Sequence, residues 1–499
     1  MSCRRLYHRF FLFSVAALRR LKPLAAAYRS WQPLLLCLLL LAVSCRSKAD
    51  PATLERWGLP VDLNEHLEQL EVLRLPEAVD RLDWLSDHLR TLLASRTAVQ
   101  DLRGLPASLD VLDISYTRVH DLKGLPKALD SLDITNCDAN DLEDLPQTIS
   151  SLAIGGTQIK SLKDLPKSLT ELTLADVDLK TLDGLPPHLQ SLTWEGSRLE
   201  VVGRHLPSSL KFLSLNGPGI KDLKALPVSL QSLELLVDAD TEVSLDELPP
   251  LLAHLTVDEN YIPDLTRLLY LQSLDVRRTS LPLSKLPKSL EQLTVNSARI
   301  EDLHALPPSL RTLGFISGSM IDFSKLPATL ESLDVTGCRN MALQGLPPNL
   351  RELNISWSEV ADIHGLPAAL QRLDISNTPL TSVGSLPAHL VSLQFRWSKV
   401  ASLPKLPTSL RQLDLSGSSN LEKMEALPPT LDTLNLSKTP LSALPTLPST
   451  LKKLDISNSH IHDLSNLPSH LETLKLGVGQ IRSLRGLPSS VRVLEFVEH

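Results

Sequence analysis

The sequence predicts an α/β solenoid, a horseshoe of about 21 short repeats with a parallel sheet on its concave side and a mostly non-helical convex side. Two observations lead to this fold class: a Leu-Pro pair returns every 19 to 22 residues, and each copy carries a short alternation of apolar and polar residues. The composition agrees, because aromatic residues make up only 4% of the 499 residues and 36 Pro stand against 20 Gly. A chain with so short a period folds as stacked units rather than as separate globular domains.

The Leu-Pro pairs fix the phase of the repeat. Two degenerate copies begin at Leu85 and Arg267, where Ser86 and Leu268 replace the Pro. Twenty residues are too few for a strand and a full helix, so extended Pro-containing segments are expected on the convex side. The 19 regular copies begin at Leu105, Leu125, Leu145, Leu165, Leu185, Leu206, Leu226, Leu248, Leu286, Leu306, Leu326, Leu346, Leu366, Leu386, Leu406, Leu427, Leu447, Leu467 and Leu487.

Each copy is expected to contribute one strand. In the copy LPAALQRLDISNTPL, the alternation of Leu373 and Ile375 predicts a short strand with one buried face, and Leu370 and Leu380 are expected to turn inward on either side. Trp194 takes an inward position of this kind and is expected in the core. One copy cannot bury its apolar face, so neighbouring copies must stack around a continuous leucine core.

A column of small polar residues follows the predicted strands. At this turn a hydroxyl or thiol can satisfy backbone groups that stacking buries, so the column is interpreted as structural rather than nucleophilic. Its members are Thr117, Cys137, Thr157, Ser197, Thr279, Cys338, Ser358, Thr378, Ser398, Ser418, Thr439 and Ser459.

The repeat LPxSLxxLxIxxTxIxxLxxLP resembles the LPX-type repeats of bacterial leucine-rich-repeat proteins, which include secreted effectors, over about residues 85–496. The resemblance implies a solenoid that binds a protein partner on its concave face. Some relatives add a helical ubiquitin-ligase domain with a catalytic cysteine. Here three residues follow Phe496 and no cysteine follows Cys338, so no enzymatic activity is expected. The alternative is an effector of the ligase type whose catalytic domain is absent or supplied by another chain.

Residues 1–45 form a basic and apolar leader. The first 44 residues carry seven Lys or Arg and no acidic residue, and an apolar run of about ten residues spans 34–43, too short to cross a bilayer as a helix. The order predicts export, to the cell envelope or outside the cell. Leu41-Ala42-Val43-Ser44-Cys45 resembles a bacterial lipoprotein box in which Cys45 is lipidated; the alternatives are a plain export signal and an organelle-type leader.

The two ends of the solenoid are expected to differ. Residues 46–84 are expected to form an N-terminal helical cap, because Leu63, Leu67 and Leu70, and then Val79, Leu82, Leu85 and Leu89, have helical spacing. The solenoid then spans residues 85–499. Its last strand, at 491–497, has no following sequence to cover it, and the open edge suggests end-to-end self-association.

Charge and cysteine usage narrow the choice of partner. Beyond the leader, 43 basic residues stand against 57 acidic ones, which argues against nucleic acid and favours basic or neutral proteins. Cys137 and Cys338 lie ten repeats apart and are not expected to meet. No cofactor motif or metal-ligand spacing is present. An outward column of Asp is read as part of the repeat that makes the concave face acidic: Asp113, Asp133, Asp275, Asp334, Asp374, Asp414 and Asp455.

Large side chains interrupt the repeat on three adjacent copies. Trp357, Arg372, Arg396 and Trp397 are expected to project outward as one patch, and aromatic and Arg side chains are the usual anchors of protein interfaces. The competing interpretation is a set of scattered surface residues. Further candidates for partner binding are Arg277, Arg278 and Tyr116.

Overall fold

The structure is a computed structural model, and Ala49–His499 form one compact unit in it. The leader and Cys45 lie outside the described residues, so export and lipidation stay predictions. The structure describes residues 48–498 except 180, 197–205, 218–222, 224–225, 237–247, 259–263, 279–280, 298–302, 318–321, 340–342, 422–423 and 425.

The described residues contain a parallel sheet of 22 strands in which each strand pairs with the next along the chain. This confirms the predicted solenoid. The strands are β1 Val72–Arg74, β2 Thr91–Leu93, β3 Val111–Asp113, β4 Ser131–Asp133, β5 Ser151–Gly155, β6 Glu171–Ala175, β7 Ser191–Glu195, β8 Phe212–Asn216, β9 Ser232–Leu236, β10 His254–Asp258, β11 Ser273–Arg277, β12 Gln292–Asn296, β13 Thr312–Ile316, β14 Ser332–Asp334, β15 Glu352–Asn354, β16 Arg372–Asp374, β17 Ser392–Gln394, β18 Gln412–Asp414, β19 Thr433–Asn435, β20 Lys453–Asp455, β21 Thr473–Gly477 and β22 Val493–Val497.

Helices are few and short. The described helices are α3 Pro51–Arg56, α4 Leu63–His66 and the 3-10 turns η1 Leu67–Gln69, η3 Leu283–Lys285, η4 Leu303–Ala305 and η5 Phe323–Lys325. The convex side is therefore mostly non-helical, as expected. None of the helices in the described part of the chain is long and apolar enough to cross a membrane.

The N-terminal region departs from the sequence prediction in two ways. The sheet begins with β1, one repeat before the copy at Leu85, so the expected cap contains a strand. The helical spacing of Val79, Leu82, Leu85 and Leu89 does not form a helix; these buried residues lie in turns between β1 and β2. Apolar residues spaced three and four apart also fit the two inward turns of a repeat, which explains the wrong interpretation.

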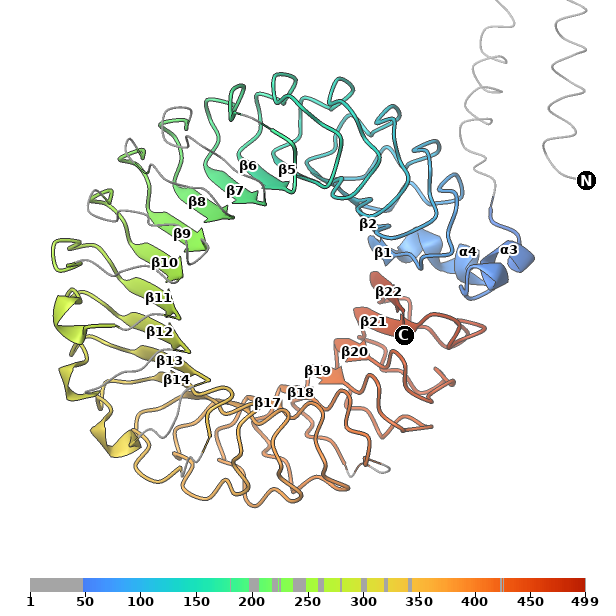
Figure 1. Ribbon diagram of the computed structural model, residues 1–499. Coiled ribbons are helices and arrows are strands. Elements are labelled where there is room, and N and C mark those ends of the chain that lie inside the picture. The colour runs from blue at the N-terminus through green and yellow to red at the C-terminus, as the bar shows by residue number, and fades with distance from the viewer. Residues whose placement is uncertain are drawn as a thin grey trace, which may run out of the picture. The chain divides into compact units, whose positions relative to one another are not determined.

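The described sheet has no open edge, because its last strand pairs with its first. β22 lies parallel to β1, with Val493 opposite Val72 and Leu494 opposite Leu73. Figure 1 shows the strands lining the inside of a ring, with β22 beside β1. The expected free edge at 491–497 is therefore wrong, and end-to-end self-association loses its physical basis. The horseshoe curves until it closes.

Side chains on both sides hold this seam between β22 and β1. The Asp62 carboxylate accepts hydrogen bonds from the Ser483 hydroxyl at 2.7 Å and from the Leu484 N–H at 2.9 Å. Arg74 Nε lies 3.3 Å from Glu495 Oε2. Gly58 has a φ of 72°, and a Cβ there would lie 2.5 Å from Val478 Cγ1, so this position at the seam favours glycine.

Most described members of the column of small polar residues bind backbone groups, as a structural role requires; Ser197 and Thr279 lie outside the described residues, and the Thr157 hydroxyl is buried without a hydrogen bond. The Thr378 hydroxyl donates to Ile375 O at 2.8 Å, and the Cys338 thiol donates to Phe315 O at 3.0 Å. The side chains of Cys137 and Cys338 are both buried, and neither forms a disulfide. Burial raises the pKa of the Cys137 thiol, which disfavours the reactive thiolate.

In many repeats an Asp or Asn after the central leucine ends the strand; β11 is an exception, because Asp275 Oδ1 makes no such bond and the strand runs for five residues. Asp374 Oδ1 accepts the Ser376 N–H at 2.9 Å, and Asn435 Oδ1 accepts the Ser437 N–H at 2.9 Å. Such a turn ends the strand after three residues. Where Thr, Ala, Gly or Lys stands there instead, the strand runs for five residues, as in β5, β6, β12, β13 and β21.

Candidate functional site

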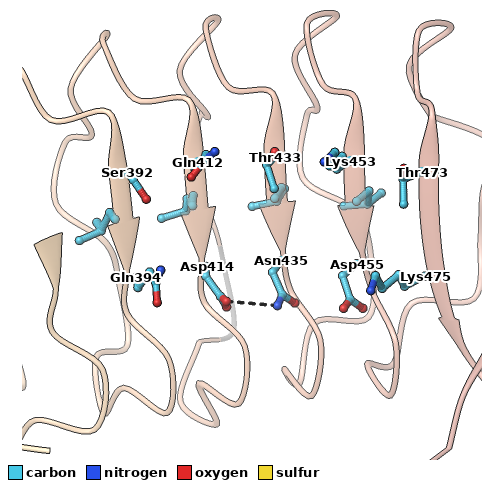
Figure 2. A pocket seen from close by; sticks show the side chains of 14 residues that line it. Ser392, Gln394, Gln412, Asp414, Thr433, Asn435, Lys453, Asp455, Thr473 and Lys475 are labelled. Carbon is cyan, nitrogen blue, oxygen red and sulfur yellow. Dashed lines mark hydrogen bonds between the residues drawn. The ribbon is translucent and has the colours of Figure 1, made fainter. Parts of the chain in front are cut away.

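The inner wall of the ring carries two rows of side chains, one on each side of the buried central leucines. Figure 2 shows them on five adjacent strands, with one row running from Ser392 to Thr473 and the other from Gln394 to Lys475. These strands, β17 to β21, border a shallow hollow of ≈ 290 Å³. Its other labelled side chains are Gln412, Asp414, Thr433, Asn435, Lys453 and Asp455.

The polar groups of this hollow bind each other. Asn435 Nδ2 donates to Asp414 Oδ2 at 3.3 Å, and Lys475 Nζ lies 3.1 Å from Glu495. Asp455 accepts the N–H and the hydroxyl of Ser457, and burial raises the pKa of this carboxyl. The carboxylates thus act as hydrogen-bond acceptors within the wall, and the arrangement suits recognition by hydrogen bonds and charge.

Another column of side chains, here called the tryptophan column, lies four residues after each central leucine, where the chain turns out of the strand. Its backbone is left-handed: Tyr116, Arg278, Trp357 and Trp397 have φ values of 57°, 52°, 60° and 53°. The N–H groups of Trp357 and Trp397 donate to the carbonyl groups of the next repeat at 2.9 and 2.8 Å. These indoles therefore project from a fixed backbone at the carboxyl ends of the strands.

The three aromatic residues of this column are among the most exposed large apolar side chains. Trp357 is 67% exposed, and Trp397 and Tyr116 are each 53% exposed. The Trp397 ring lies against the next repeat, because a Cβ on Gly417 would fall 2.5 Å from it. The Arg96 guanidinium lies 5.0 Å from the Tyr116 ring centre. Both aromatic rings are thus supported on one side and exposed on the other.

The predicted arginines all have acidic neighbours. Arg372 lies 2.9 Å from Glu352, and Arg396 lies 3.3 Å from Asp374 and 2.7 Å from Gln394 Oε1. In the repeat of β11, Arg277 contacts Asp275 at 3.1 Å and Arg278 contacts Asp258 at 3.0 Å.

The structure brings only part of the predicted patch together. Trp357 and Trp397 occupy the same column two repeats apart, with Asn377 between them, and Arg396 directly precedes Trp397. Arg372 is the first residue of β16 and so lies at the opposite end of its strand from this column. The tryptophans lie past the strands because Asn354 and Gln394 already end β15 and β17. Tyr116, Arg277 and Arg278 belong to distant repeats.

One exposed apolar cluster was missed by the sequence analysis. Val228, Leu251, Leu269 and Tyr270 are 74%, 48%, 73% and 62% exposed and lie on three consecutive repeats. Leu251 and Tyr270 replace a Ser or Thr found in most other copies two residues after the Pro. This departure from the consensus could have revealed the exposed apolar cluster from the sequence.

No group of three or more His, Cys, Asp or Glu residues within the described ranges is placed to hold a metal ion. The buried central leucines and the parallel pairing of consecutive strands define the class: a leucine-rich-repeat solenoid whose sheet closes on itself.

Among solved structures, the chain is similar to YopM from Yersinia enterocolitica WA-314 at 25% identity, covering 94% of this chain and 99% of that one, with a TM-score of 0.35. It is also similar to CroV588, described as a novel circular LRR protein, at 21% identity, 88% and 75% coverage and a TM-score of 0.45. An internalin, InlF of Listeria monocytogenes, matches at 19% identity, 63% and 89% coverage and a TM-score of 0.31. No family model and no curated protein matches the chain.

Proposed function

We propose that this protein is a non-enzymatic recognition ring that binds a protein partner through the tryptophan column and the neighbouring inner wall. The observation that carries the proposal is the pair Trp357 and Trp397, exposed by 67% and 53% on a backbone that the next repeat holds in place. Aromatic residues with little freedom to lose are the strongest anchors of protein interfaces. Arg396, beside Trp397, supplies a charged contact.

The test replaces both tryptophans with asparagine. Asn already occupies this column at Asn136, Asn377 and Asn458, so the left-handed turn tolerates it. A photo-crosslinking residue at position 377, between the two indoles, is used to capture the partner from the producing cells. Purified Trp357→Asn/Trp397→Asn protein is expected to bind that partner at least about tenfold more weakly, since each hot-spot residue contributes about 2 kcal/mol or more.

The control is Lys438→Asn, which introduces the same residue in the same column at φ 56°, two repeats beyond Trp397, without removing an aromatic ring. Its affinity for the captured partner is expected to equal that of the unchanged protein. Equal affinity of the tryptophan variant, with an unchanged circular dichroism spectrum, would refute the proposal.

We also propose that the protein is exported, and that Cys45 is the lipid attachment site. The support is the order of the leader: basic residues, a short apolar run and then a lipoprotein-like box. Mass spectrometry of the mature N-terminus is expected to find an acylated Cys45, and Cys45→Ser is expected to move the protein from the membrane fraction to the soluble fraction. A mature chain that retains residues 1–44 would contradict export by cleavage.

A further inference from the structure

Closure of the ring limits what can reach its inner wall. Twenty-two strands at about 4.8 Å spacing give a circumference of about 106 Å and a diameter of about 34 Å between facing backbones. Side chains on both walls narrow the opening to roughly 20–25 Å. A helix with its side chains is about 10–12 Å wide, whereas even a small domain is about 30 Å across. The opening therefore accepts a single polypeptide segment and excludes a folded domain.

The charge of the inner wall is divided into two arcs. From β3 to β15, neither row contains Lys or Arg, and the acidic residues are Asp113, Asp133, Glu171, Glu234, Asp275, Asp334 and Glu352. From β16 through β22 to β1, four basic residues balance four acidic ones: Arg74, Arg372, Lys453 and Lys475 against Asp374, Asp414, Asp455 and Glu495. Two of the seven acidic residues form ion pairs, Asp275 with Arg277 at the end of its own strand and Glu352 with Arg372 on the next strand. The other five still make this side of the opening acidic, whereas the other side is close to neutral.

The electrostatic field of the acidic arc extends to the middle of the opening. The axis lies roughly 10 Å from either wall, which is about one Debye length at 0.1 M salt. A concave surface lined by one sign of charge also concentrates its field. Apart from the seven acidic residues, most side chains of this arc are Ser or Thr, so a bound segment can approach the strands closely. Phe212, on the first position of β8, adds an apolar contact among them.

We infer that the ring binds a basic polypeptide segment of a protein partner, a helix or an extended tail, threaded through its opening against the β3–β15 arc. This inference rests on the proposed function and deepens it, because it names the part of the partner that the inner wall receives. A segment with a free end enters the closed ring, and a segment with folded domains on both sides enters only when the seam opens.

The variants for the test are Glu171→Gln with Glu234→Gln, both on the acidic arc. Asp113, Asp133 and Asp334 are unsuitable, because they also hold the turns that end their strands. The matched control is Glu143→Gln with Glu359→Gln, which makes the same change of charge at exposed positions outside the strands. Circular dichroism checks that all four proteins, including the tryptophan variant, retain their fold.

The probe is a fluorescent helical peptide of four Ala-Ala-Lys-Ala-Ala units, measured by anisotropy at about 20 mM salt, where charge screening is weak. It is prepared free, with a folded protein of about 100 residues at one end, and with that protein at both ends. The free and one-ended forms are expected to bind alike, and the two-ended form at least tenfold more weakly. The Glu171→Gln/Glu234→Gln ring is expected to bind the free peptide at least tenfold more weakly than the control.

Three outcomes would overturn the inference: no binding of the free peptide, equal binding of the two-ended form, or equal binding by the acidic-arc variant. The Trp357→Asn/Trp397→Asn protein is expected to bind the peptide normally. If threading fails while this variant still loses its captured partner, the proposed function stands and the threaded segment is wrong. If threading is observed while the tryptophan variant binds the captured partner normally, the tryptophan surface is wrong and the binding site on the inner wall stands.

Discussion

A tryptophan in the left-handed backbone region is costly for the fold unless something else retains it. Gly and Asn adopt this region most readily, and the same column holds Gly337, Asn377 and Gly417 around the two tryptophans. The indoles at 357 and 397 are mostly exposed, so core burial does not explain them. This contrast between backbone cost and exposure favours a role in binding.

Asp455 provides a test of charge at a single residue. Burial raises the pKa of its carboxyl, so the folded protein binds a proton more readily than the unfolded chain does. The stability contributed by this residue therefore falls as pH rises from the ordinary carboxyl pKa through the raised value. An Asn at position 455 can still accept the Ser457 N–H, as Asn435 accepts the Ser437 N–H in the preceding repeat. The Asp455→Asn protein is therefore expected to be more stable than the unchanged protein at neutral pH, by less than about 1 kcal/mol.

Urea unfolding at about pH 4 and about pH 7 checks this prediction. The difference in free energy of unfolding between the variant and the unchanged protein should be larger at the higher pH. A variant that is less stable at both pH values would show instead that the charge of Asp455 stabilises the wall through Lys475.

At the scale of one repeat, a ladder of hydroxyls connects each repeat to the previous one. The Ser309 hydroxyl donates to Lys288 O and Leu290 O, both at 2.7 Å. Ser409 and Thr450 make the same pair of bonds to their preceding repeats. The consensus Ser was visible in the sequence, but its partner was not, because the bond crosses to a residue about 20 positions earlier.

The ladder predicts opposite effects for two substitutions. Ser309→Ala removes both bonds and is expected to lower the free energy of unfolding by about 1 kcal/mol, the usual net value of a hydrogen bond. Ala369 occupies the same position two copies after Thr329, and Ala369→Ser is expected to raise it by a similar amount. Chemical denaturation measures both. If the two variants have the same free energy of unfolding, the hydroxyl ladder does not stabilise the contact between repeats.

Sequence reasoning succeeded for features set within one repeat and failed for features set between distant ones. Period, central leucines and the buried Trp194 follow from local pattern, and all are found in the structure. Trp357 was expected to project from its strand because the turn made by Asn354 was not recognised. The closing strand β1 was missed because the preceding Leu67 and Leu70 have helical spacing, and Leu67 does lie in the 3-10 turn η1.

At the scale of the whole unit, closure depends on a small rotation per repeat. Twenty-two repeats close a circle at about 16° each, and an error of one degree per repeat would leave a gap of about one strand. No single motif encodes that angle. The contacts across the seam are the local sign of closure, since Asp62, Arg74 and Glu495 contact residues more than 420 positions away.

Closure makes a prediction for hydrogen exchange. Terminal strands of an open solenoid fray, whereas in a ring β1 and β22 have partners on both sides. Their amides are expected to exchange as slowly as those of β6. Asp62→Ala with Arg74→Glu removes two contacts of the seam and places Glu opposite Glu495, and is expected to lower protection in β1 and β22 about 10- to 100-fold, or about 1.4–2.7 kcal/mol.

The control for this experiment is Asp121→Ala with Arg311→Glu, which removes an Asp acceptor and an ion pair of the same kinds elsewhere in the ring. It should leave β1 and β22 protected. In the seam variant β6 should keep its protection, since opening at one joint leaves the other strand pairs intact. Fast exchange in β22 of the unchanged protein would mean that the ring is open in solution, and with it the size limit on the inner wall would disappear.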